Sequence, residues 1–248
     1  MISTPSSDIC IKNKEKHWNN GEVHYVIDDN VPEALVLCVE NAMHKISRIS
    51  SVKFMKKTNE KDYIRIIDEN GYWSYVGKKG GEQKLSVTEG WPHPEGHIIH
   101  ELMHALGFYH EHCRPDRDTY VIVEEGLENN FDYRRCEGSD VILFGGYDLE
   151  SIMNYPLQVK QNIIGANNIG QRQYLSEGDK RALNLLYPGP FLRRRFSLPL
   201  FFLPPSLSPS LSLSLSSPLS LSLSLSPFPS FSPSLSISLS LSLDRNDE

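Results

Sequence analysis

Long apolar runs are absent from this chain, although 39% of its 248 residues are hydrophobic. No stretch is continuous enough to span a bilayer, and residues 1–6 lack the apolar core of a signal peptide. An excess of positive charge is also absent, because the formal net charge is −6. We therefore expect neither a membrane-spanning protein nor a protein that binds nucleic acid.

Cysteine is scarce, and the chain has only Cys10, Cys38, Cys113 and Cys136. This even number allows three complete pairings if the protein folds in an oxidising compartment. A disulfide between Cys113 and Cys136 would add ~3 kcal/mol through loop-closure entropy. Free buried thiols are an equally good interpretation, so the pairing stays open.

A balanced globular composition is missing from the last part of the chain. From about Arg193 the sequence becomes proline, phenylalanine and then alternating leucine and serine. This repeat lacks the turn residues and varied side chains that close a core. A TC nucleotide repeat read in triplets encodes serine and leucine in alternation, so residues 191–248 are either a disordered tail or translated repeat DNA. We expect one globular domain before this tail.

The most informative pattern that is present is the sequence HELMHALGFYHE. On a helix, His100 and His104 project from one face a turn apart, close enough to bind one ion. Gly107 stands where the helix must stop, since glycine tolerates positive φ, and the turn that follows brings His110 back toward the metal. Glu101 lies beside these ligands. The pattern predicts a catalytic zinc site in a peptidase.

Three protein ligands leave one position of a zinc ion open to water, whereas a structural ion is usually closed by four ligands. We therefore expect one catalytic zinc ion in the domain. A bare His-Glu-x-x-His can arise by chance on an amphipathic helix, but no packing argument also requires Gly107 and His110 at these offsets. His97 and His112 lie nearby without fitting the spacing, and we interpret both as ordinary polar histidines.

Further residues resemble one known family, the astacins, a branch of the metzincin endopeptidases. Glu111 directly follows the third histidine, and the run RPDRD over residues 114–118 reproduces the family's extension. The sequence SIMNY at 151–155 is similar to the family's Met-turn, and WSYVG at 73–77 to its substrate-facing edge strand. The resemblance covers about residues 15–189. It points to a cysteine-poor member, because Tyr72, Trp91 and Pro188 stand near places where animal members usually carry cysteine.

The resemblance implies roles for residues around the zinc site. Met153 is expected to form an apolar floor beneath the ion, and the phenol oxygen of Tyr155 to be a displaceable fifth zinc ligand. A phenol near the metal can also swing to donate a hydrogen bond to the developing oxyanion. An extended substrate would add a strand to the edge segment by main-chain hydrogen bonds. This edge segment consists of Trp73, Ser74 and Tyr75. Arg172 resembles part of a specificity wall that favours Asp or Glu after the cleaved bond, although a structural salt bridge is equally compatible.

The resemblance also implies an endopeptidase that hydrolyses protein or peptide substrates through a zinc-activated water, with Glu101 as the general base. It implies secretion and an inhibitory propeptide, so we expect residues 1–14 to precede a catalytic domain over residues 15–190. Glu111 would then pair with the amino group freed by cleavage upstream of Trp18. The alternatives are an inactive zinc-binding homologue and a non-functional product of a truncated gene. The natural substrate and the oligomeric state cannot be predicted.

Hydrophobic periodicity predicts the elements of this domain. Apolar residues recur at helical spacing over residues 31–50, and a second helix carries the zinc motif from about 95 to 106. A last helix over 177–186 begins at the N-cap Ser176. Strand patterns occur at 23–27, 63–67, 73–76 and 84–87. We expect an α+β, metzincin-like, two-lobed domain with a mixed sheet and two long helices in its N-terminal half, and an irregular C-terminal half that ends in a helix.

Overall fold

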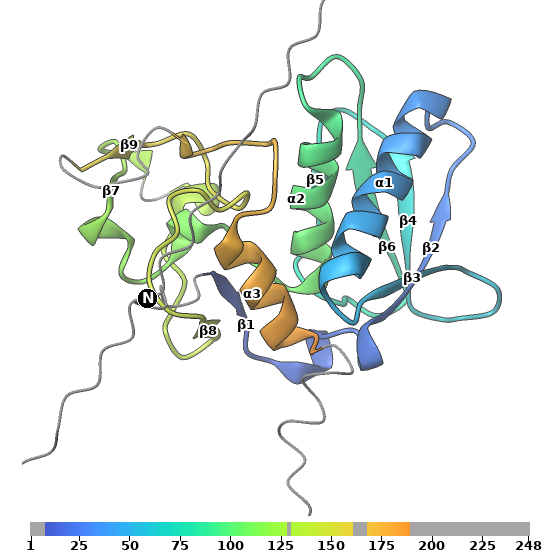
Figure 1. Cartoon of the computed structure of the whole chain (residues 1–248), viewed down its shortest axis with the longest axis horizontal. Coiled ribbons are helices and arrows are strands. Elements are labelled where there is room, and N and C mark those ends of the chain that lie inside the picture. Colours follow the sequence, from blue (N-terminus) through green and yellow to red (C-terminus); the bar gives the residue numbers. More distant parts are fainter. Residues whose placement is uncertain (1–7, 128–129, 161–167, 189–248) are drawn as a thin grey trace, which may run out of the picture. The chain divides into compact units, whose positions relative to one another are not determined.

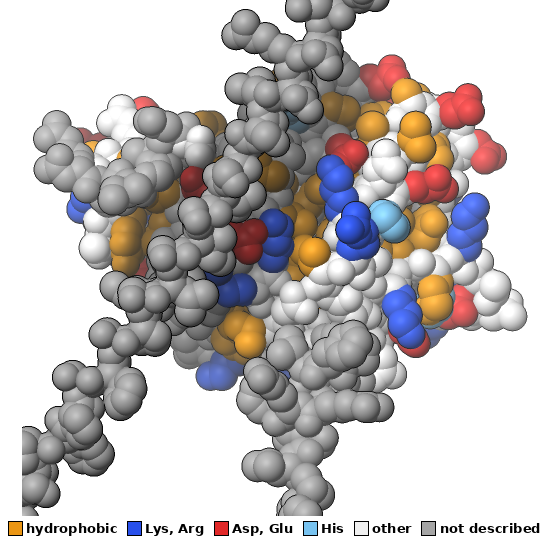
Figure 2. Space-filling view, viewed as in Figure 1, with side chains coloured by type: hydrophobic (Ala, Val, Ile, Leu, Met, Phe, Trp, Pro, Cys, Tyr) orange, Lys and Arg blue, Asp and Glu red, His pale blue; other side chains and the backbone are white. Residues whose placement is uncertain are grey.

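A computed structural model describes residues 8–127, 130–160 and 168–188 (Figure 1). The predicted tail over residues 191–248 lies outside the described residues. No helix within the described ranges is long and apolar enough to cross a membrane. Acidic and basic side chains are interspersed on the face shown in Figure 2, without a large patch of one sign.

A five-stranded mixed sheet forms the N-terminal half of the domain, in the order β3-β2-β4-β6-β5. Its strands are β2 (Glu22–Ile27), β3 (Lys53–Lys56), β4 (Tyr63–Asp68), β5 (Trp73–Ser74) and β6 (Glu82–Val87). The first three pairings are parallel, and β5 is antiparallel to β6. Strand β5 therefore lies at the edge of the sheet, as expected for the segment that resembles the substrate-facing strand.

Two long helices, α1 (Glu33–Ile49) and α2 (Pro94–Leu106), pack side by side against the sheet (Figure 1). Helix α1 buries one stripe of apolar residues at helical spacing, including Leu35, Val39 and Ile46. Helix α2 is buried all round from Ile98 to its end. Neighbouring segments cover α2 on every side, so this helix is the element on which the functional residues can be held most rigidly.

The C-terminal half has little regular structure apart from α3 (Glu177–Leu186), whose predicted N-cap is present. Ser176 Oγ accepts a hydrogen bond from the Asp179 N–H, and the Asp179 carboxylate accepts one from the Ser176 N–H, which forms a capping box. The other elements are short strand pairs: β1 (Ile9–Ile11) with β8 (Val141–Leu143), and β7 (Val121–Ile122) with β9 (Gln158–Val159). The predicted α+β, metzincin-like fold is confirmed.

Strand β1 lies inside the segment 1–14 that we expect to precede the catalytic domain. Ile9 and Cys10 are nevertheless fully buried. The Ile11 N–H donates to the Gly107 carbonyl at 2.8 Å, and the Tyr109 N–H donates to the Ile9 carbonyl at 3.0 Å. Because β1 brackets the turn after the zinc helix, these contacts favour a domain that starts at or before Ile9 rather than at residue 15.

All four cysteines are free thiols in this structure. Cys113 and Cys136 nevertheless lie close together, since the Cys136 N–H donates to the Cys113 carbonyl at 2.8 Å. Of the two interpretations that the sequence leaves open, the structure shows the free thiols.

Candidate metal centre and active-site cleft

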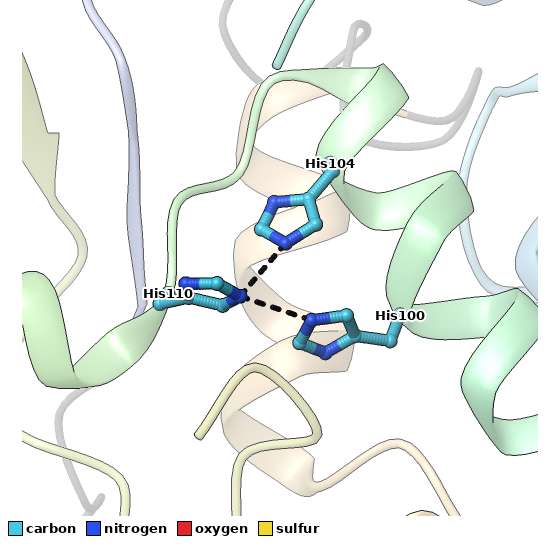
Figure 3. Close-up of side chains that lie close together, drawn as sticks. All are labelled: His100, His104 and His110. Atoms are coloured by element: carbon cyan, nitrogen blue, oxygen red, sulfur yellow. Dashed lines mark hydrogen bonds between the residues drawn. The ribbon is translucent and has the colours of Figure 1, made fainter. Parts of the chain in front are cut away.

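Helix α2 carries His100, Glu101 and His104, and it ends at the glycine that the sequence singled out. Gly107 adopts a φ of +109°, and its N–H donates to the carbonyl of His104. The chain then turns, and His110 returns toward the helix (Figure 3). A side chain other than glycine would strain this conformation, so the third histidine reaches the site because position 107 is glycine.

The three imidazoles converge on one point. Nε2 of His110 lies 3.2 Å from Nε2 of His100 and 3.0 Å from Nε2 of His104 (Figure 3). In a tetrahedral zinc site with Zn–N bonds of about 2.0–2.1 Å, neighbouring nitrogens lie about 3.3 Å apart. These two distances suit a single zinc ion, and the ligand atoms of all three histidines lie within 4.8 Å of one another.

Hydrogen bonds on the far side of two rings fix which nitrogen faces this point. Nδ1 of His100 donates to the Ile152 carbonyl and Nδ1 of His104 to the Phe108 carbonyl, each at 2.8 Å. A carbonyl can only accept, so each Nδ1 carries the proton and each Nε2 presents a lone pair. Burial lowers the pKa of His104 to about 4 and the pKa of His100 well below its usual range, which keeps both rings neutral. Converging lone pairs on neutral rings are the donor set that a metal cation requires.

Glu101 lies in the same cleft and is only 5% exposed. Burial raises the pKa of Glu101 to about 8, and the positive charge of Arg172 opposes this rise. A carboxyl group with such a pKa can change its protonation state near neutral pH, as a general acid and base must.

The cleft has a volume of about 770 Å³ and is lined by residues from both halves of the domain. Tyr155 borders it, with its ring centroid 4.3 Å from that of His110. Of the edge segment, Trp73 borders the cleft. Ser74 pairs with Leu85 on β6, and Tyr75 is 42% exposed. The structure thus brings Tyr155 and Trp73 to the predicted site, but not the side chains of Ser74 and Tyr75.

An aromatic cluster that the sequence analysis did not find forms one wall of this cleft. The rings of Tyr72 and His97 stack at 4.8 Å, and the ring of Trp91 meets their edges at 6.1 Å and 5.3 Å. Trp91 is 55% exposed. The only signal in the sequence is that Tyr72 and Trp91 stand near the places where relatives carry cysteine.

The Met-turn lies behind the three converging histidines. Met153 is 1% exposed, and its carbonyl accepts a hydrogen bond from the Glu111 N–H at 3.0 Å. The preceding residue, Ile152, supplies the carbonyl that holds His100. The floor role of Met153 stays a prediction, but the backbone of this turn demonstrably orients one of the three histidines.

Arg172 is held by backbone rather than by a carboxylate. Its Nη1 donates to the carbonyls of Asn154 and Gln171, each at 2.9 Å. The part of the chain that the structure describes shows no ion pair at this residue, so the salt bridge that we considered is not present there. A Cβ atom at Gly96 would lie 1.7 Å from the Arg172 carbonyl oxygen. Only glycine therefore lets the first turn of α2 approach this segment so closely.

Glu111 is fully buried, and its Oε1 accepts a hydrogen bond from the Asp148 N–H at 3.0 Å. Arg114 Nη1 lies 3.5 Å from the same oxygen. Oε2 of Glu111 and both carboxylate oxygens of Asp8 are buried without a hydrogen-bond partner among the described residues. Burial and neighbouring carboxylates raise the pKa of both Glu111 and Asp8. This region is therefore short of positive charge.

His112 differs from the ordinary polar histidine that we expected, because it is fully buried. His110, His112 and Cys113 form a second group of side chains close enough together to hold a metal. Both ring nitrogens of His112 already make hydrogen bonds, to the Tyr155 N–H and to the Asp132 carbonyl. The first group, with three Nε2 atoms facing one point, is the better metal site.

Fold and site together define an α+β domain in which three histidines on and after a buried helix converge as the ligands of a metal ion would. The family model Astacin, which describes a family of peptidases, matches residues 10–188. High choriolytic enzyme 1 from Oryzias latipes is 35% identical over 185 residues, which cover 69% of this chain and 68% of that protein. An astacin-like metalloendopeptidase from Gallus gallus is 36% identical over 178 residues, covering 66% of this chain and 43% of that protein.

Among solved structures, that of high choriolytic enzyme 1, a hatching enzyme zinc-protease, is similar, with a TM-score of 0.57 and 31% identity. The match covers 69% of this chain and 92% of that chain. The chain belongs to the astacin family. It is a zinc metalloendopeptidase, which confirms zinc as the cofactor and proteins or peptides as the substrate class.

Proposed function

We propose that this chain hydrolyses peptide bonds of extended protein substrates with Glu101 as the general base. The observation that carries the proposal is the position of the Glu101 carboxyl group in the cleft where the Nε2 atoms of His100, His104 and His110 converge. Its pKa of about 8 suits a group that takes a proton and later returns it.

The histidines would hold one zinc ion, which when bound supplies a Lewis acid that favours deprotonation of water and polarises the peptide carbonyl. Glu101 accepts the proton of the attacking water and passes it to the departing amine. Burial raises the pKa of Tyr155 well above its usual range, so its phenol stays protonated. It can then donate a hydrogen bond to the oxyanion that develops on the substrate.

The substrate would lie extended along β5. The order of the strands leaves the outer side of β5 without a strand partner among the described residues, and Trp73 on this strand borders the cleft. Main-chain hydrogen bonds to such an edge give affinity that depends little on sequence. Arg172 also lines the cleft and is fixed by carbonyls, which supports a preference for Asp or Glu after the cleaved bond.

We also propose that the protein is secreted and matures by proteolysis, as its resemblance to the astacins implies. The buried oxygens of Asp8 and Glu111 that lack partners support the second part, because a freed α-amino group would supply the missing positive charge. Chains that begin at successive positions from Ser7 to Lys16 should differ sharply in stability and activity. Starts beyond Ile11 should be the poorest, because they delete β1. Equal behaviour of all starts would refute the maturation proposal.

Replacement of Glu101 by Gln tests the proposed mechanism. The amide cannot accept the proton of the water, but no metal ligand is removed, so cleavage of casein should be lost while zinc stays near one per chain. An inactive zinc-binding homologue would show no casein cleavage in the unaltered chain, and a non-functional gene product would not give soluble, zinc-loaded protein. Substantial activity of the Glu101→Gln enzyme would remove Glu101 as the base.

A further inference from the structure

His112 fills the space behind two residues of the proposed active site. Its ring is fully buried and stacks on the ring of His110 at 4.9 Å and 17°. The ring of Tyr155 lies 4.6 Å from it. A single side chain therefore packs against both a predicted metal ligand and the predicted oxyanion donor.

Two hydrogen bonds fix the orientation and the tautomer of this ring. The Tyr155 N–H donates to Nδ1 at 3.3 Å, so Nδ1 must present a lone pair. Nε2 lies 2.9 Å from the Asp132 carbonyl, which can only accept, so Nε2 must carry the proton. The ring thus joins the backbone of the Met-turn at Tyr155 to the backbone at Asp132, and it can do so in only one tautomer.

The backbone of His112 is itself fixed. Arg117, which is 2% exposed, donates from Nη1 to the His112 carbonyl at 2.9 Å and also to the Tyr133 carbonyl. Because these hydrogen bonds hold the backbone of His112 in place, the ring of His112 gives the Tyr155 N–H a rigid hydrogen-bond partner.

We propose that His112 is a positioning residue, which sets where the phenol of Tyr155 stands relative to the metal ligands. The backbone N–H of Tyr155 is hydrogen-bonded to His112, and the Tyr155 ring packs against the rings of His110 and His112. An oxyanion donor must lie within hydrogen-bond distance of an atom that becomes charged only in the transition state, and small displacements cost rate. The proposal rests on the proposed role of Tyr155.

Two substitutions separate hydrogen bonding from packing. His112→Phe keeps a flat ring for stacking but leaves the Tyr155 N–H and the Asp132 carbonyl without a partner. His112→Gln is the conservative variant, because its amide carries an acceptor and a donor side by side, as imidazole does. We expect kcat for a quenched fluorogenic peptide to fall about tenfold in the Phe variant and to stay within about threefold of wild type in the Gln variant, with KM and zinc content little changed.

A double-mutant cycle with Tyr155→Phe gives the decisive readout. Tyr155→Phe alone should lower kcat by about 10² to 10³, the usual effect of losing one oxyanion donor. In that background His112→Phe should lower kcat by no more than about twofold further, because there is no phenol left to position. Zinc per chain and the melting temperature are measured for each variant beside kcat.

The outcomes are distinguishable. If Tyr155→Phe leaves kcat unchanged, the proposed role of Tyr155 fails. If Tyr155→Phe lowers kcat but His112→Phe does not, or lowers it equally in both backgrounds, His112 only packs and the present inference is wrong. Loss of zinc with an unchanged kcat per bound zinc would also overturn it, because His112 would then support only the metal ligand His110 and not Tyr155. If His112→Phe does not fold, His112→Asn replaces it, since the shorter amide can reach only one of the two partners.

Discussion

Asp179 holds together the Met-turn and the last helix, and its replacement tests how the site is supported from behind. Its carboxylate is fully buried and accepts hydrogen bonds from Ser151 Oγ at 2.7 Å, the Ile152 N–H at 3.0 Å and the Ser176 N–H at 2.8 Å. The carbonyl of Ile152 in turn orients His100. Removal of one buried carboxylate should therefore affect both stability and metal binding.

The expected magnitude follows from these partners. Asp179→Ala leaves three buried donors without an acceptor, at a cost of about 1–3 kcal/mol each, offset in part because a buried charge is also removed. We expect a net loss of about 4 kcal/mol and a melting temperature lower by roughly 10 °C. Asp179→Asn keeps one oxygen for the two backbone donors, while Ser151 can turn its hydroxyl to accept, so its cost should be about 1 kcal/mol or less at pH 7.

The pH dependence has a definite sign. Burial raises the pKa of Asp179 from its ordinary value of 3.8 to about 6. The carboxyl group therefore contributes most stability below pH 4, and this contribution is lost as the pH rises through 6. Thermal unfolding of both variants and the wild type between pH 4 and 7 checks this, with zinc release to a chelator measured in parallel. Equal stability of Asp179→Ala and the wild type would contradict this prediction. So would a wild type whose stability, relative to that of Asp179→Asn, increases as the pH rises.

Two further predictions concern packing and thiols. Gly96→Ala should displace the segment at Arg172, because the new Cβ would lie 1.7 Å from the Arg172 carbonyl oxygen, and should lower peptidase activity at least about tenfold. Gly138→Ala is the control, because a Cβ at Gly138 would have nothing within 4 Å. Equal activity of the two variants would contradict this prediction. Burial raises the pKa of Cys10, Cys113 and Cys136 to between about 11 and 12. Burial also raises the pKa of the half-buried Cys38, but without so large a shift, so iodoacetamide at pH 7.5 should label the native chain fastest at Cys38. Four labels after denaturation would confirm free thiols, whereas two would show a disulfide.

The zinc helix and its turn could be predicted because their signals are local. The geometry of a helix is enough to predict that His100 and His104 lie on one face, and Gly107 indicates the turn that brings His110 back. The helices of the N-terminal half and the N-cap of α3 were predicted for the same reason, since periodicity and capping act over a few residues.

The features that were missed depend on partners far away in the chain. Strand β1 has only three residues, and its place is decided by β8, more than a hundred residues further on. The sequence around His112 predicts an ordinary polar histidine, yet its hydrogen bonds go to Asp132 and Tyr155, which are 20 and 43 positions away. No local pattern reports burial that distant segments create. The sequence therefore identifies the ligands of the site more readily than the residues that hold them.

We expect His100, His104 and His110 to bind one zinc ion together. X-ray absorption at the zinc edge, with the metal content of the same sample, tests it most directly, because this measurement distinguishes nitrogen from sulfur ligands. We expect one zinc per chain with three imidazole nitrogens at about 2.0–2.1 Å and no sulfur, and a large loss of zinc in His110→Ala. A sulfur ligand at about 2.3 Å would place the ion at Cys113 instead and contradict this ligand set, as would zinc retained at one per chain without His110.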